Sequence, residues 1–187
     1  MKSNGDTLTG RLLVATPMLR GSVFDRAVVF MLSHDDDGAL GVMVNRPTEV
    51  SVDDVLPGWT PLLSAPGVVF QGGPVSLDSA LGLVSFGSRD EPLGIRRVKG
   101  HVGVVDLDTP TEIVAAAVSA MRVFAGYAGW AADQLEAEIA EGSWYVVDSE
   151  LSDVFRADTD DLWPLVLRRQ PGPLALMASF PEDPSLN

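Results

Sequence analysis

Apolar residues occur in short runs through the first half of the chain, and turn-forming residues separate these runs. The run 26–34 (RAVVFMLSH) is apolar from Ala27 to Leu32, which is typical of a strand that is buried on both faces. The turn residues DDDG follow, and 39–45 (ALGVMVN) returns as a second strand, so the pattern predicts a β-hairpin. Similar runs predict further strands at 11–19, ended by Pro17, and at 79–86 and 95–105, and 67–74 is predicted as a strand that runs into a Gly-Gly-Pro turn.

Helical patterns enter in the second half of the chain. Thr109-Pro110 followed by Glu112 combines an N-cap, a proline at the first helical position and a glutamate at the third. Apolar residues from Ile113 to Phe124 recur at helical spacing, so the sequence predicts a helix from 109 to about 125. Capping and stop residues predict shorter helices at 51–54, 133–142 and 160–169, and apolar runs predict strands at 144–147 and 174–180.

The order of these elements favours an α+β fold over a regular βαβ series, because strands dominate the first half and helices mix into the second. Neither a linker-like stretch nor an internal repeat divides the chain, so we expect a single domain over 1–187. With 46% hydrophobic residues, the chain has ample material for a core. It contains no cysteine, which excludes disulfides, thiolate catalysis and zinc sites built on cysteine.

The sequence carries no sign of a membrane span or of a secretion signal. No apolar run approaches the roughly 18 residues that are needed to cross a bilayer. The opening residues MKSNGDTLTG lack a basic stretch followed by an apolar one. We therefore expect a cytoplasmic protein that does not interact with membranes.

The chain is strongly acidic, with a formal net charge of −13. Most of this charge lies after residue 105, where fifteen acidic residues stand against four basic ones. Phosphate backbones are normally held by clustered lysine and arginine. The one such cluster, RRVKGH at 96–101, would divide its side chains between the two faces of a strand. The charge therefore argues against direct binding of nucleic acid.

His34 stands beside three consecutive aspartates, which raises the question of a metal site. Adjacent residues of a strand point to opposite faces, so His34 and Asp35 would not converge on one ion. The spacing also lacks the alternating oxygen ligands and the final glutamate of an EF-hand. A hairpin turn with solvated carboxylates explains the same residues, so we predict no metal site and no cofactor.

Gly72-Gly73-Pro74 follows a predicted strand and could cradle a phosphate. However, the lysine and hydroxyl residue that complete a P-loop are missing. The favoured interpretation is a tight turn whose backbone closely approaches another segment.

No catalytic constellation is identifiable, and we lean towards a protein that is not an enzyme. The chain has no G-x-S-x-G motif, and only His34 and His101 could supply an imidazole base. The aromatic residues Tyr127 and Trp130 are interpreted as packing at a junction between two helices rather than as a ligand platform.

Five segments spread over essentially the whole chain form a specific combination: LTGRLLVATPML, FDRAVVFMLSHDDDGALGVMVNRP, FQGGPV, YAGWAADQLEAEIAEGSWYVV and the terminal PEDPSLN. In this order they resemble the AlgH/YqgE family of bacterial proteins. The resemblance implies an α+β fold with a bifurcated mixed β-sheet, a small barrel-like portion and surrounding helices. It implies neither a cofactor nor a catalytic residue.

The same resemblance connects the chain with transcriptional regulation. The acidic charge, and the lack of a helix-turn-helix with a basic recognition helix, favour an indirect role through a protein partner. Ala131-Ala132 departs from the Gly-Pro that family members often carry, which loosens the turn before the acidic helix. Positions that match the family motifs give a candidate ligand or shared-surface site at His34, Asn45, Arg46, Gly72, Gly73 and Pro74, and a candidate partner surface at Trp130, Gln134 and Glu138.

Two functional hypotheses remain open. The favoured one is a regulatory or interaction module that binds a protein or a small ligand, with a basic partner attracted by the glutamate-rich stretch 133–141. The alternative is a small-molecule enzyme whose cleft is formed by the 26–47 hairpin and the Gly72-Gly73-Pro74 turn. This alternative requires His34, Asn45 and the turn to meet at one pocket.

Overall fold

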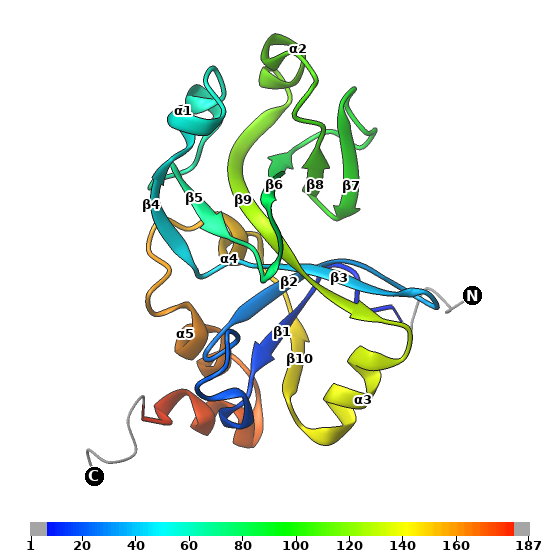
Figure 1. Cartoon of the computed structure of the whole chain (residues 1–187), viewed down its shortest axis with the longest axis vertical. Coiled ribbons are helices and arrows are strands. Elements are labelled where there is room, and N and C mark those ends of the chain that lie inside the picture. The colour runs from blue at the N-terminus through cyan, green and yellow to red at the C-terminus, as the bar shows by residue number, and fades with distance from the viewer. Residues whose placement is uncertain (1–6, 182–187) are drawn as a thin grey trace.

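The computed structural model of the chain describes residues 7–181, and its strands form one sheet that divides into two branches (Figure 1). The long strand β9 (Val118–Ala131) belongs to both branches. In the first branch, antiparallel strands follow β9 in the spatial order β3 (Gly38–Met43), β2 (Val28–Asp35), β1 (Arg11–Ala15) and β10 (Trp144–Asp148).

In the second branch, β5 (Val68–Gln71) and β6 (Val75–Phe86) flank β9 on opposite edges. β4 (Pro47–Ser51) pairs with β5, whereas β8 (Val102–Val105) and then β7 (Ile95–Lys99) extend the sheet beyond β6. This branch curls into a half-barrel (Figure 1), and among the described residues no pairing joins β4 to β7. The α+β class and the bifurcated sheet with a barrel-like portion are thereby confirmed.

Short helices lie at the ends and sides of the sheet (Figure 1). The hairpin predicted from the sequence is formed by β2 and β3, and the helices predicted at 51–54, 133–142 and 160–169 are present within a few residues. The helices are α1 (Val52–Val55), α2 (Thr111–Ala115), α3 (Gln134–Glu141), α4 (Leu151–Phe155) and α5 (Leu162–Arg168), together with 3-10 helices at Pro17–Leu19, Thr60–Leu62 and Gly172–Ser179.

The long helix predicted from 109 to about 125 is wrong. α2 ends at Ala115, and β9 begins only three residues later. Within β9 the apolar side chains alternate between two clusters, with Met121 and Val123 in one and Phe124 in the other. Such residues fit helical spacing as well as alternation, and pairing with β3, β5 and β6 decides for the strand because it satisfies the backbone along its length. Tyr127 and Trp130 consequently lie within β9 and not between two helices.

The strand predicted at 174–180 is also wrong, because Gly172–Ser179 forms a 3-10 helix. Leu174, Met177 and Ala178 pack against the main core. Their spacing of three and four residues brings side chains to one face of a helix, whereas a strand would divide them between two faces. The terminal motif PEDPSLN lies outside the described residues beyond Pro181.

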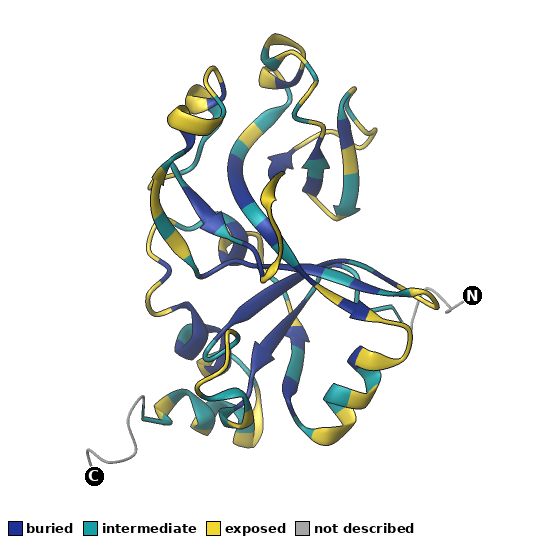
Figure 2. Cartoon of the chain, in the orientation of Figure 1, coloured by how far each residue is buried: buried dark blue, intermediate teal, exposed yellow. Residues whose placement is uncertain are grey.

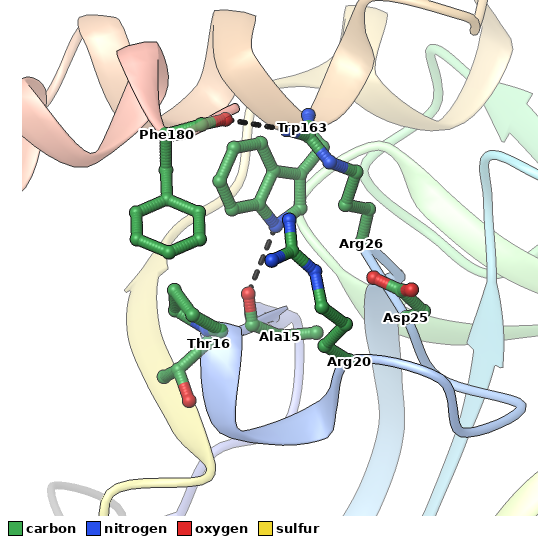
Figure 3. A pocket seen from close by; sticks show the side chains of 8 residues that line it. Ala15, Thr16, Arg20, Asp25, Arg26, Trp163 and Phe180 are labelled. Atoms are coloured by element: carbon green, nitrogen blue, oxygen red, sulfur yellow. Dashed lines mark hydrogen bonds between the residues drawn. The ribbon is translucent and has the colours of Figure 1, made fainter. Parts of the chain in front are cut away.

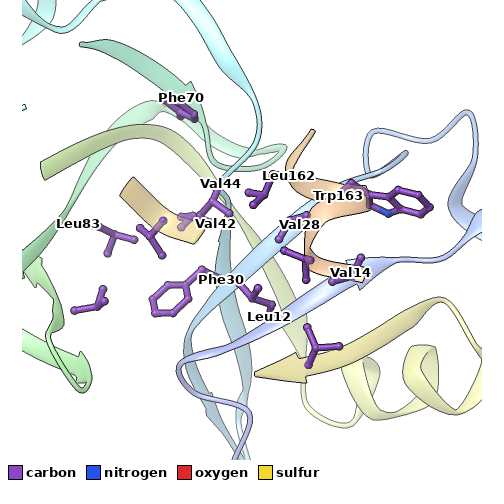
Figure 4. Packing of buried hydrophobic residues seen from close by; sticks show 14 of the residues in the cluster. Leu12, Val14, Val28, Phe30, Val42, Val44, Phe70, Leu83, Leu162 and Trp163 are labelled. Carbon is purple, nitrogen blue, oxygen red and sulfur yellow. The ribbon is translucent and has the colours of Figure 1, made fainter. Parts of the chain in front are cut away.

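The main hydrophobic core joins the two branches (Figure 4). Phe30 of β2 packs in the same cluster as Leu83 of β6, Phe70 of β5 and Leu162 of α5, and all four are buried. Buried residues follow most of the strands and α5, whereas exposed residues gather on α1 and α3, on β4 and on the first half of β6 (Figure 2). The two branches therefore share one hydrophobic core.

Arg122 lies within this core although its side chain is charged and only 2% exposed. Its Nη1 donates to the Val154 carbonyl (2.7 Å), and its Nη2 donates to the carbonyls of Ala65 (2.9 Å) and Arg156 (2.8 Å). The guanidinium also lies 4.2 Å from the centre of the Phe70 ring. Burial lowers the pKa of Arg122 to about 10, so the side chain stays charged at neutral pH and ties β9 to two neighbouring segments.

Candidate functional site

The turn Gly72-Gly73-Pro74 carries the chain across β9, from β5 on one edge to β6 on the other. A Cβ atom at Gly73 would lie 2.1 Å from the Tyr127 carbonyl carbon, and one at Gly72 would lie 2.3 Å from the Gly126 carbonyl oxygen. No side chain fits at such distances, so the crossing requires glycine. The turn is thus a close backbone approach, as the favoured interpretation of the sequence predicted.

The same turn lies beside the end of the hairpin strand β3 and the residues that follow it. The Met43 N–H donates to the Gly72 carbonyl (2.7 Å), and the Gln71 N–H donates to the Arg46 carbonyl (2.8 Å). The hairpin and the turn are therefore adjacent, as the enzyme hypothesis required. The contact between them is made by backbone hydrogen bonds.

Asn45 and Arg46 hold the loop that enters β2. The Asn45 side chain is buried, with Oδ1 accepting from the Val28 N–H and Nδ2 donating to the Arg26 carbonyl, both at 2.9 Å. Arg46 donates from Nη2 to the Asp25 carbonyl. Burial lowers the pKa of Arg46, and the nearby charge of Asp25 acts in the opposite direction.

These two residues also line a polar cleft of about 280 Å³. Residues 159–161, at the start of α5, form its opposite wall, together with Trp163 and Pro164. Carboxylates and guanidiniums of opposite sign face the same space, because Asp25, Asp160 and Asp161 line it together with Arg26 and Arg46. The cleft is thus electrostatically mixed and favours neither an anion nor a cation.

His34 lies at the other end of the hairpin, next to its turn, and is buried. Its Nδ1 accepts a hydrogen bond from the Leu8 N–H (3.0 Å), so this nitrogen carries no proton. Its Nε2 lies 2.8 Å from Oε1 of Glu136 on α3 and therefore donates to that carboxylate. His34 connects the N-terminal segment with α3, and the length of the hairpin separates it from Asn45.

Trp130, Gln134 and Glu138, the predicted partner surface, bond to one another. Glu138 Oε2 accepts from the indole N–H groups of Trp130 and Trp144, each at 2.9 Å, and Oε1 accepts from Gln134 Nε2 at 2.9 Å. The two indoles pack edge to face with ring centres 6.0 Å apart, and Phe24 contacts both. The carboxylate thus fastens α3 to β9 and β10.

A small pocket lies where the C-terminal 3-10 helix meets the first branch (Figure 3). Arg26 lies 4.4 Å from the Trp163 ring centre and donates to the Phe180 carbonyl at 2.5 Å. Trp163 Nε1 donates to the Ala15 carbonyl at 2.9 Å. The enclosed volume is about 10 Å³, which is room for about one water molecule, so these residues form a packed contact.

An apolar groove of about 240 Å³ lies in the curled branch, and the sequence analysis did not predict it. Its floor contains Val69 of β5 and Val123 of β9, both buried. Its walls carry exposed apolar side chains: Val50 of β4 is 46% exposed, Val55 of α1 is 51% exposed and Leu77 of β6 is 54% exposed. The remaining lining residues are Thr48, Asp78, Ser79, Ala80, Phe124 and Ala125.

A local signal for the groove was present in the sequence. In TEVSVDDV and VSLDSA, isolated apolar residues stand among polar ones, and such residues are normally assigned to a half-buried face. Only the fold places Val50, Val55 and Leu77 around one space that remains open.

The described part of the chain shows two further features. Residues 7–181 contain no group of three or more histidine, aspartate or glutamate side chains that could hold a metal ion. Within the same range, none of the helices has the length and apolar character needed to span a bilayer.

The two-branched sheet, joined through one long shared strand, defines an α+β protein whose second branch carries the open apolar groove. The chain belongs to the AlgH-like family (DUF179), whose model matches residues 12–175, and the resemblance found in the sequence motifs is thereby confirmed. It is 59% identical over 185 residues to the UPF0301 protein SCO2948 of Streptomyces coelicolor. That alignment covers 97% of this chain and 96% of the relative. A UPF0301 protein of Thermobifida fusca is 50% identical to this chain, and the alignment covers 97% of this chain and 96% of that protein.

Two solved structures have the same fold. Protein DIP2367 from Corynebacterium diphtheriae matches with a TM-score of 0.88 and 33% identity, covering 96% of this chain and 95% of that chain. The AlgH protein from Pseudomonas aeruginosa matches with a TM-score of 0.71 and 24% identity, covering 96% and 97%. The split sheet is therefore a property shared with these proteins.

Proposed function

We propose that this chain is an interaction module that binds a protein or a small ligand in the apolar groove. The observation that carries the proposal is the exposure of Val50, Val55 and Leu77 around a buried floor. Contiguous apolar surface is unfavourable in water, and on soluble proteins it is common at binding sites. The regulatory role that the family resemblance implied would then act through the bound partner and not through DNA.

The geometry favours the groove over the two sites that the sequence suggested. On α3, Glu136 bonds to His34 and Glu138 bonds to the tryptophans, so these glutamates are engaged within the fold. The enzyme hypothesis needs His34 and Asn45 at one pocket, but they lie at opposite ends of the β2–β3 hairpin. The groove, by contrast, combines accessible apolar side chains with a fixed floor.

Paired substitutions of exposed leucines test the proposal. Leu77→Ser removes one groove wall, whereas Leu93→Ser removes a leucine that is 74% exposed and does not line the groove. Each tagged variant is used to capture proteins from a Streptomyces coelicolor lysate, at low and at physiological salt. Any protein retained is then purified, and its Kd for each variant is measured by calorimetry. In parallel, the wild-type chain is screened by thermal shift against metabolites, since ligands that bind the folded state raise its Tm.

The expected result is a partner or small ligand that binds the wild type and Leu93→Ser equally and binds Leu77→Ser at least about tenfold more weakly. Binding that Leu77→Ser leaves unchanged would place the interaction elsewhere and overturn the proposal. A lysate and a screen that yield no reproducible ligand would overturn it as well.

A further inference from the structure

The walls of the apolar groove carry negative charge only. From residue 47 to residue 80, which includes β4, α1, β5 and the first half of β6, the chain contains no lysine, arginine or histidine. Asp78 is the charged residue that lines the groove, whereas Glu49 and Asp54 do not line it and are only next in sequence to lining residues. Arg122, the cation next to the floor residue Val123, is buried, does not line the groove and donates to the carbonyls of Val154, Ala65 and Arg156. No basic residue lines the groove, and Asp78 gives its lining a negative charge.

The groove meets the first half of β6 along the edge of the strand. Leu77, Asp78, Ser79 and Ala80 all line it, although consecutive strand side chains point to opposite faces. The pairing between β6 and β9 skips from Val75 to Ala80, and the pairing with β8 begins only at Gly82. Residues 76–79 form an irregularity in the pairing with β9, where Ser76 has a φ of 50°; no strand pairing involves them among the described residues, and all four are exposed. Exposed backbone that has no strand partner offers hydrogen-bonding groups to an additional extended segment.

Building on the proposed function, we infer that the groove binds an extended segment of a partner protein in which apolar and basic residues alternate. The apolar side chains of the segment fill the space between Val50, Val55 and Leu77. Its lysines or arginines face the acidic residues around the groove, and its backbone pairs with the open edge of β6. Strand addition of this kind gives affinity through the backbone and specificity through the alternating side chains.

The charge of the chain separates this occupant from other candidates. A second copy would bring another acidic groove and a net charge of −13 to the same surface. Nucleic acids, anionic lipids and fatty acids would meet a wall without a basic residue. A cationic segment gains attraction where each of these meets repulsion.

Fluorescence anisotropy with synthetic peptides tests the inference. The probe is a labelled peptide of about eight residues in which valine and lysine alternate, a length close to that of an average strand. Three matched peptides replace lysine by glutamate, replace valine by serine, or carry N-methyl groups on alternate backbone nitrogens. The triple variant Glu49→Gln, Asp54→Asn, Asp78→Asn removes charge from the groove lining and from positions next in sequence to it. The control triple Asp90→Asn, Asp133→Asn, Glu141→Gln removes the same charge from exposed positions that do not line it.

We expect the valine–lysine peptide to bind at least about tenfold more tightly than each matched peptide. The groove triple variant should weaken its binding about fivefold, the control triple should have little effect, and about 0.15 M salt should reduce the difference. Leu77→Ser should weaken binding of the same peptide, whereas Leu93→Ser should not.

Other outcomes separate this inference from the proposed function. If the lysine and glutamate peptides bind equally and Leu77→Ser weakens both, the groove is a docking site but its preference for a cationic segment is wrong. If the N-methylated peptide binds as tightly as its parent, strand addition is wrong. If the peptide binds all variants alike, or does not bind the wild type, the inference is overturned, while the lysate and metabolite experiments decide the proposed function independently.

Discussion

Replacing Glu138 by alanine tests how far two buried tryptophans depend on one carboxylate. Trp130 and Trp144 both donate their indole N–H to Glu138 Oε2 at 2.9 Å, and both rings are buried. Without the carboxylate, neither donor has a partner within the network, and an unsatisfied buried donor costs about 1–3 kcal/mol. The higher helix propensity of alanine offsets a few tenths of a kcal/mol of this cost. We therefore expect Glu138→Ala to lower the free energy of unfolding by about 3 kcal/mol.

Urea unfolding followed by tryptophan fluorescence measures this change directly, because two of the four tryptophans lie in the network. Glu141→Ala is the matched control, since it removes an exposed glutamate from the same helix and should change stability by less than about 0.5 kcal/mol. Glu138→Gln keeps one oxygen that can accept both indoles and should cost about 1 kcal/mol. A loss of less than about 1 kcal/mol for Glu138→Ala would refute the reasoning that the carboxylate fastens α3 to the sheet.

Three further substitutions test other contacts, each by urea unfolding. Gly73→Ala should lower the free energy of unfolding by more than about 3 kcal/mol because its Cβ would meet the backbone of Tyr127 at 2.1 Å. Gly87→Ala has open space around it and should be nearly neutral. Equal effects of the two substitutions would contradict the close approach of Gly73 to β9. Arg122→Met should cost about 3–5 kcal/mol because three carbonyls lose their donor. Burial lowers the pKa of Arg122 from its ordinary value to about 10 in the folded chain, so both states keep the proton below about pH 9. The difference from wild type should therefore stay constant between about pH 6 and pH 9. The contribution of Arg122 to the free energy of unfolding would rise with pH only above about pH 10, where the folded chain binds fewer protons than the unfolded chain. A difference between wild type and Arg122→Met that changes with pH near neutrality would contradict the lowered pKa of Arg122. Asp153→Asn should cost about 3 kcal/mol, because fully buried Asp153 accepts from Arg169 at 2.7 and 2.5 Å and thereby raises the pKa of Arg169; a loss below about 1 kcal/mol would count against this pair.

The elements that local sequence predicted correctly are those in which the apolar pattern and the turn or capping residues agree. The β2–β3 hairpin has an apolar run, an acidic turn with Gly38 and a returning strand. α3 ends at Glu141 and is capped by Gly142, whose φ of 90° is unfavourable for other residues. In both cases the residues that stop the element are local, so no distant contact is needed to place it.

The residues of the predicted site illustrate the limit of local reasoning. The family motifs grouped His34 with Asn45 and Arg46, and their places in one hairpin suggested proximity. A hairpin of two extended strands instead separates its turn from its open end, so His34 meets α3 while Asn45 meets the loop before β2. The partners of these side chains come from segments that no local pattern connects to them.

The sequence by itself determined the acidic charge, the absence of cysteine, the α+β class and the close approach at Gly72 and Gly73, because these follow from composition, local spacing and the missing side chain of glycine. The tertiary structure alone decided that 118–131 is a strand and that Val50, Val55 and Leu77 surround an open groove. An apolar stripe can serve either a helix or a strand, and only pairing on both edges of β9 selects between them. Likewise, whether an apolar side chain is covered depends on which distant strands curl towards it, and in the second branch they curl without closing.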